Sequence, residues 1–272
     1  MKSLCQPNIP YQSALAFYKN LNFISEVGII NEITNLEKAM LGFKPNLMLL
    51  ECQYITPEVK AFCDKNNTKL IAFGENENFV DMLITKNNSL LETSEKIFLD
   101  VKFPSLEMLG YRDRSIQKTD ISVFADVDMH KFIVEFLCKN YNVKVYGKLK
   151  INSPRYLGIP TEVEKYEIYN KSKFVIDLTG SSQVDTVLLD THPIIASDID
   201  FDDRILSFND LVSLISIMDV TNDPPKELDV KLQSLKNDMI QNSDIDFVDK
   251  FLSQLGFNTN NLKVQKGEYL SC

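Results

Sequence analysis

The stretch KFVIDLTGSSQVDTVLLDTHPII, residues 173–195, contains the pattern that decides the fold class. An apolar β-rich run ends in Thr-Gly-Ser-Ser at residues 179–182, a segment with helical spacing follows, and His192-Pro193 begins a second β-rich run. A strand, a helix and a strand in this order are typical of a parallel α/β sheet. The small hydroxyl-bearing residues between strand and helix either bind an anion at the helix N-terminus or form only a tight turn.

The same alternation extends along most of the chain. Continuous apolar runs of strand length, such as Leu47–Glu51 and 69–74, suit parallel strands that are covered on both faces. Residues 104–118 contain a proline, a glycine and mixed charges, and we interpret them as a linker. The sequence therefore predicts two Rossmann-like α/β domains with mostly parallel sheets, residues 1–117 and 118–272, with a ligand cleft between them.

Composition restricts the function classes. The net charge of −9 over 272 residues argues against nucleic acid as a partner, because such binding needs a basic face. Five scattered cysteines and only two histidines favour reduced thiols and make a zinc site improbable. No apolar run has the length of a membrane span or a signal peptide, so we expect a cytoplasmic protein.

The turn at residues 179–182 has the chemistry of a phosphate site. The first turn of a helix has unpaired N–H groups and a partial positive charge. Gly180 permits close approach to the backbone, and Ser181 and Ser182 add hydroxyl donors. Asp185, one turn further on, has the carboxylate that a ribose or sugar diol would need. The competing interpretation is a capped helix after a tight turn, because Ser, Thr and Gly are common there.

An ordered series of short motifs surrounds this turn. A strand ends in Tyr-Gly at Tyr146-Gly147, the loop contains YLGIP at residues 156–160, and a helix with Tyr-x-x-Ser-Lys precedes the strand and its turn. Over roughly residues 120–220 this series resembles the C-terminal donor domain of GT-B glycosyltransferases, particularly the small bacterial spore-coat-type branch. The resemblance implies that a nucleotide-diphosphate sugar is the substrate, that no cofactor or metal is needed, and that the donor-side positions are Gly147, Lys148, Tyr166, Tyr169, Ser172, Thr179, Gly180, Ser181, Ser182 and Asp185.

The chain departs from that family pattern in its charges. The Ser/Gly loop lacks the usual arginine, and the acidic residue on the helix is the shorter Asp185. The loop after the first strand of the second half has the carboxylates of Asp126 and Asp128 where a glycine or a basic residue is usual. Two carboxylates beside a diphosphate weaken its binding, and Lys148 is the nearest compensating cation.

The first half offers carboxylates but no motif. Glu51 and Glu75 stand at the ends of predicted strands, where either could act as the general base for an acceptor hydroxyl, or cap a neighbouring helix. The acidic run at residues 198–203 has the composition of a metal site, but also that of a solvated loop. The helical pattern of residues 244–257 could pack on the first domain or form a surface for a protein partner.

Three functions are compatible with these patterns. The first is a GT-B-type glycosyltransferase that binds the nucleotide sugar in its second half and an unknown acceptor against its first half. The second is a glycosyltransferase-like domain that has lost its donor contacts and acts as a structural or interaction module. The third is a sugar-nucleotide epimerase of the same architecture.

Overall fold

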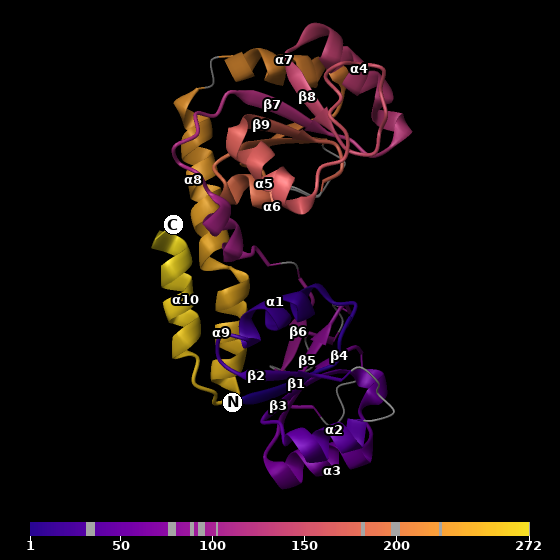
Figure 1. The fold of residues 1–272 in the computed structure, drawn as a ribbon, viewed down its shortest axis with the longest axis vertical. Helices are drawn as coiled ribbons and strands as arrows, with labels where there is room; N and C mark the ends of the chain where they lie inside the picture. Colours follow the sequence, from indigo (N-terminus) through magenta and orange to yellow (C-terminus); the bar gives the residue numbers. More distant parts are fainter. Residues whose placement is uncertain are drawn as a thin grey trace. The chain divides into compact units, whose positions relative to one another are not determined.

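The computed structural model describes residues 1–30, 36–75, 80–87, 90–91, 96–101, 103–180, 183–196, 202–222 and 225–271. The chain forms two compact units (Figure 1). Unit 1 contains Met1–Ser105 together with Asn242–Ser271, and unit 2 is the continuous segment Leu106–Gln241. This division differs from the predicted boundary at 117/118 in two ways: residues 106–117 fold with unit 2, and the last helices fold with unit 1.

The sheet of unit 1 is parallel throughout. Its strand order is β2-β1-β3-β4-β5-β6, and the described strands are β1 (Lys2–Cys5), β2 (Glu26–Ile29), β3 (Leu47–Glu51), β4 (Lys69–Phe73), β5 (Met82–Thr85) and β6 (Ile97–Leu99). Leu47 to Leu50 are fully buried, as expected for a strand that is covered on both faces. The first strand lies between the second and the third, so the chain changes direction across the sheet between β1 and β3.

Helices cover both faces of this sheet (Figure 1). On one face, α1 (Gln12–Leu21) packs against α9 (Asp244–Gln254), where the ring of Phe17 contacts the rings of Phe247 and Phe251 at centroid distances of 5.6 and 5.8 Å. On the other face lie α2 (Leu36–Phe43) and α3 (Pro57–Asn66), and α10 (Asn260–Ser271) packs on α9. The C-terminal helices therefore complete the core of unit 1.

The start of α3 follows directly from its sequence. The hydroxyl of Thr56 accepts a hydrogen bond from the amide of Val59 at 3.3 Å, and Pro57 occupies the first helical position. Both features are standard helix-start signals, and Asn67 ends the helix in the left-handed conformation. Thr56-Pro57-Glu58 therefore predicts a helix start from sequence alone, and the structure confirms it.

Unit 2 has its own parallel sheet, with strand order β11-β10-β9-β7-β8. Its strands are β7 (Asp120–Phe124), β8 (Val143–Tyr146), β9 (Ser172–Asp177), β10 (His192–Ala196) and β11 (Leu206–Phe208). The change of direction here falls between β7 and β9. Ligands of open α/β sheets bind outside the carboxyl ends of the strands at this point. The loops after β7, β8 and β9 therefore form the candidate ligand site of unit 2.

The helices of unit 2 also form two layers. One face of the sheet is covered by α4 (Lys131–Asn140) and α7 (Leu211–Asn222), and the other by α5 (Glu162–Lys171), α6 (Gln183–Leu188) and α8 (Lys226–Gln241). The segment predicted as a linker contributes a short 3-10 helix, Leu106–Tyr111, whose leucines are buried. Among the described residues, no helix combines the length and apolar composition that a bilayer crossing requires.

Candidate functional site

The carboxyl edge of the second sheet gathers several of the predicted residues. Backbone hydrogen bonds join the three strand ends: the amide of Leu178 donates to the carbonyl of Phe124 at 3.0 Å, and the amide of Ala125 donates to the carbonyl of Tyr146 at 3.0 Å. The turn after β9 therefore lies beside the loop after β7, and that loop lies beside the loop after β8. Thr179, Gly180 and Gly147 belong to these loops, as predicted.

A buried carboxylate organises the turn after β9. Oδ1 of Asp177, a fully buried residue, accepts hydrogen bonds from the amide of Thr179 at 2.9 Å, the hydroxyl of Thr179 at 2.7 Å and the amide of Gly180 at 3.0 Å. Gly180 has φ of +73°, which suits glycine. These donors are thus directed at an anion that the strand itself supplies. Ser181 and Ser182 lie outside the described residues.

Gly147 joins two of the loops through close backbone packing. Its φ is +120°, and a Cβ at this position would lie 2.2 Å from the carbonyl oxygen of Ala125. Its amide donates to the carbonyl of Gly158 at 3.0 Å, and its carbonyl accepts a hydrogen bond from the hydroxyl of Tyr156 at 3.0 Å. A residue without a side chain is therefore required here for loop packing alone.

The neighbouring loop presents a carboxylate and a cation that do not pair with each other. Oδ1 of Asp126 accepts a hydrogen bond from the backbone amide of Lys148 at 2.9 Å. The Lys148 side chain is exposed, and its ammonium group has no carboxylate partner in the described part of the chain. The carboxylate thus uses a backbone donor of this loop, while the Lys148 side chain is exposed to solvent.

Tyr166 and Asp185 lie on the helices that flank the turn. Burial raises the pKa of Tyr166 to about 12, and the carboxylate of Asp185 acts in the same direction. The ring of Tyr166 contacts the ring of Tyr111, with a centroid distance of 4.6 Å. Asp185 is half-buried in the first turn of α6, so both residues are near the carboxyl edge but are also part of the packing there.

Tyr169 and Ser172 are not brought to this edge. Ser172 begins β9 and Thr179 follows its end, so the strand separates them. The hydroxyl of Ser172 donates to the carbonyl of Ile168 at 2.7 Å, which ties the end of α5 to the start of β9. Tyr169 is 2% exposed and packs on Phe124. Both residues stabilise the unit from inside.

The predicted carboxylates of unit 1 lie at the carboxyl edge of the first sheet. Glu51 ends β3 at the point where the strand order changes direction, and Gln6 follows β1. The side-chain amide of Gln6 donates to Glu51 Oε2 at 2.5 Å, and the backbone amide of Glu51 donates to Gln6 Oε1 at 2.9 Å. Gln53 Nε2 also donates to Oε2, at 3.3 Å. Glu75 is exposed just beyond β4.

The acidic run at residues 198–203 is only partly described. Asp202 forms an ion pair with Arg204, whose guanidinium also contacts Asp238 at 2.5 Å, and the Arg204 hydrogen bond lowers the pKa of Asp202 to about 2. Asp198 and Asp200 lie outside the described residues. Within the described part, no group of three or more His, Cys, Asp or Glu side chains has the arrangement of a metal site.

Two residues at these edges were not singled out from the sequence. Asp177 ends an apolar β-rich run, but an acidic residue two positions before a Thr-Gly pair is also typical of a side chain that accepts backbone hydrogen bonds in a turn. Gln6 has no sequence signal of its own, because only the pairing of β1 with β3 brings it to Glu51.

Comparisons with known proteins identify structures with a similar fold. No family model matches the chain, and no curated protein matches it. A glycosyltransferase from Rickettsia africae ESF-5 is similar in structure over 98% of this chain and 97% of that one, with TM-score 0.59 and 10% identity. A UDP-GlcNAc 2-epimerase from Neisseria meningitidis, bound to UDP-GlcNAc, is similar over 93% of this chain and 100% of that one, with TM-score 0.58 and 12% identity.

These likenesses concern the fold, because the sequence identities are low. They confirm the predicted fold class, two α/β units with mostly parallel sheets, and the neighbours are nucleotide-sugar enzymes of the GT-B type. The spore-coat-type branch stays a prediction. The chain thus has a GT-B-type fold.

Proposed function

We propose that this chain binds a nucleotide-diphosphate sugar at the carboxyl edge of the second sheet and transfers the sugar to an acceptor. The observation that supports this most is the fold, which is similar over nearly its whole length to a structure that holds UDP-GlcNAc. We assign the donor side to Gly147, Lys148, Tyr166, Thr179, Gly180, Ser181, Ser182 and Asp185. Because the amides of Thr179 and Gly180 already donate to Asp177, the phosphate donors in this proposal are the Lys148 ammonium and the Ser181 and Ser182 hydroxyls.

The proposed transfer is a direct displacement that needs no metal. A carboxylate, Glu51 or Glu75, removes the proton of an acceptor hydroxyl as its oxygen bonds to the anomeric carbon. The bond from that carbon to the diphosphate oxygen breaks, and the leaving diphosphate takes the electron pair. Lys148 and the hydroxyls of Ser181 and Ser182 offset the developing negative charge. Asp185 accepts hydrogen bonds from the ribose diol. Tyr169 and Ser172 support these positions from the core.

A second candidate function is a module that has kept the fold and lost the donor site. One specific observation favours it: Asp177 already accepts the hydrogen bonds of the Thr179 and Gly180 amides. A diphosphate at this turn meets that buried carboxylate, and Asp126 adds a second negative charge at the neighbouring loop. The fold likeness to a UDP-GlcNAc 2-epimerase makes an epimerase the third candidate.

A thermal-shift panel of UDP-, GDP-, ADP- and TDP-sugars separates the first two candidates. The proposal predicts that one nucleotide class raises the Tm, by an amount that corresponds to about 2.7 kcal/mol when the ligand is at about 100 times its Kd. The double variant Ser181→Ala/Ser182→Ala loses that shift. The matched control Ser216→Ala, on the exposed side of α7, retains it.

The outcomes of the panel are distinct. If no nucleotide sugar shifts the Tm at millimolar concentration, the donor site is absent and the module is the better account. If a shift occurs but is equal in the double variant, the sugar binds elsewhere. When a donor has been found, proton NMR of the mixture distinguishes transfer, which releases the nucleoside diphosphate, from epimerisation, which keeps the nucleotide sugar intact.

A further inference from the structure

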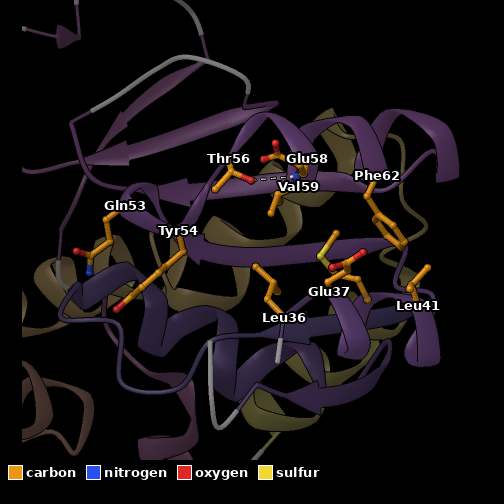
Figure 2. Close-up of a pocket in the computed structure, with 10 residues that line it drawn as sticks. Leu36, Glu37, Leu41, Gln53, Tyr54, Thr56, Glu58, Val59 and Phe62 are labelled. Carbon is orange, nitrogen blue, oxygen red and sulfur yellow. Dashed lines mark hydrogen bonds between the residues drawn. The ribbon is translucent and has the colours of Figure 1, made fainter. Parts of the chain in front are cut away.

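Unit 1 contains a cavity that includes none of the residues assigned to the donor or to the general base. It lies between α2 and α3, on the face of the sheet opposite α1 and α9, and it has a volume of about 390 Å³ (Figure 2). This volume is within the usual range for small-molecule sites, roughly 300–1,000 Å³. Side chains from α2, from the segment after β3 and from α3 line it.

The cavity has an apolar floor. Leu36, Met40 and Val59 line it and are nearly fully buried, with exposures of 7, 2 and 8%. The ring of Phe62 and the exposed side chain of Leu41 extend the apolar surface on the side of the two helices (Figure 2). A ligand that fits this floor therefore has an aromatic or branched aliphatic body, because such a body gains most from leaving water.

The charge at the cavity is negative. Glu37 and Glu58 are the charged residues of the described lining, which contains no lysine, arginine or histidine. The hydrogen bond from the Thr56 hydroxyl lowers the pKa of Glu58, so this carboxylate is ionised at neutral pH. The nearby Lys60 forms an ion pair with Asp64 at 2.6 Å.

Helix N-termini do not reverse this sign. Glu37 and Glu58 lie in the first turns of α2 and α3, where each helix contributes only about half a positive elementary charge. Two full negative charges therefore exceed the two partial positive ones. The described lining thus has a net negative charge, which disfavours an anion such as a sugar diphosphate and favours a cation. The aromatic rings of Tyr54 and Phe62, which also line it, favour a cation further.

We propose that this cavity binds a small organic amine, with its apolar body on Leu36, Met40 and Val59 and its protonated amino group attracted by Glu37 and Glu58. The site is contained in unit 1 and needs no nucleotide sugar. Gln53, which lines the cavity, donates to Glu51, so the cavity adjoins one of the two carboxylates proposed as the base. Amine binding in unit 1 and nucleotide-sugar binding in unit 2 are nevertheless measured separately, and each can fail without the other.

Three probes that share one ring system test the charge preference. Tryptamine has an indole body and an ammonium group, tryptophol replaces the amine with a neutral hydroxyl, and indole-3-acetate has a carboxylate. In calorimetric titrations of the full chain, tryptamine should bind, and the affinity of tryptophol should be lower by a factor of about ten or more. Indole-3-acetate should give no binding. The proposal is overturned if millimolar tryptamine does not bind or if tryptophol binds equally well.

Variants locate the binding. Glu37→Gln/Glu58→Gln should reduce tryptamine affinity to the level of tryptophol and leave tryptophol unchanged. Because these residues also offset helix dipoles, a second variant is needed. Leu41→Lys places a cation at the cavity on a side chain that is 58% exposed, so the fold should tolerate it. Leu15→Lys is the matched control: this leucine is 54% exposed on α1, on the other face of the sheet.

The comparison of the two lysine variants decides the location. Leu41→Lys should lower tryptamine affinity about tenfold or more while Leu15→Lys leaves it unchanged. Equal affinities in both variants would show that tryptamine binds elsewhere, and would overturn the proposal. Neither variant should alter a nucleotide-sugar shift in the thermal panel, since the donor positions belong to unit 2.

Discussion

The buried carboxylate of Asp177 accepts a hydrogen bond from the amide of Gly180, 3.0 Å away, across the turn that ends β9. The same oxygen also accepts hydrogen bonds from the amide and the hydroxyl of Thr179. The strand therefore supplies an internal anion to a turn whose sequence resembles an external anion site. A diphosphate that binds at this edge has to find its donors beyond Gly180, or at Lys148.

Replacing Asp177 with alanine should destabilise unit 2. Two backbone amides and a hydroxyl in a half-buried turn lose the carboxylate that accepts their hydrogen bonds, and the loss of a buried acceptor costs about 1–3 kcal/mol. We expect a fall of about that size in the free energy of unfolding, measured by urea titration. Asp177→Asn keeps one acceptor oxygen and should recover part of the loss. Asp219→Ala, at an exposed position of α7, is the control, and a similar loss there would contradict the assignment.

Gly147→Ala should disrupt the loops after β7 and β8. The new Cβ lies 2.2 Å from the Ala125 carbonyl oxygen, and the φ of +120° is unfavourable for alanine. We expect a loss of about 2–4 kcal/mol in the free energy of unfolding. Gly110→Ala is the matched control, because nothing lies within 4 Å of a Cβ there. Equal Tm values for the two variants would contradict the packing described for Gly147.

Lys118 should make the stability of unit 2 depend on pH. Burial lowers its pKa from 10.5 to about 8, while its ammonium donates to Thr191 Oγ1 at 2.9 Å and to the Tyr169 carbonyl at 3.0 Å. Between about pH 8 and 10.5 the unfolded chain binds more protons at this residue than the folded chain does. The contribution of Lys118 to stability therefore rises with pH across this window.

The measurement is the free energy of unfolding of the wild type and Lys118→Gln at several pH values. The wild type should gain stability relative to the variant as the pH rises from about 8 to 10.5. The difference between the two proteins removes the contribution of other groups that titrate there. A difference that is constant across the window would show that burial does not shift this lysine.

Phe251→Ala should weaken unit 1 although the residue is far in sequence from the strands of that unit. The ring is 1% exposed and contacts Phe17 of α1 and Phe98 of β6 at centroid distances of 5.8 and 4.1 Å. Truncating a buried phenylalanine costs about 3–5 kcal/mol. Hydrogen exchange should accelerate in β1 and α1 and stay unchanged in β7. Val264→Ala, exposed on α10, should change neither.

Local patterns predicted much of the fold. The Thr56-Pro57 helix start and the apolar runs of β3 and β4 depend only on neighbouring residues, and the structure confirms them. The local sequence pattern of residues 1–21 does not predict the inner strand β1 or the helix α1 that these residues form. Ser3 and Gln6 interrupt the apolar pattern there, and the position of β1 is set by pairing with β2 and β3, which is not a local property.

Long-range contacts also decided what the sequence left open. The apolar face of residues 244–257 suited either packing on the first half or a partner surface, and only the contacts with Phe17 show that it closes unit 1. At the candidate site, the order of strand, turn and helix was predicted. The direction of the Asp177 carboxylate could not be predicted. An acidic residue at a strand end can face a ligand or accept hydrogen bonds from its own turn, and the sequence is the same in both cases.

The discontinuity of unit 1 has a consequence for biosynthesis. Unit 2, residues 106–241, leaves the ribosome as one uninterrupted segment, whereas residues 1–105 emerge early and wait for α9, which is translated after all of unit 2. Until then the face of α1 that bears Phe17 is uncovered. Unit 1 therefore completes its core only after all of unit 2 has been synthesised, and its earlier part is exposed to aggregation or chaperones for longer.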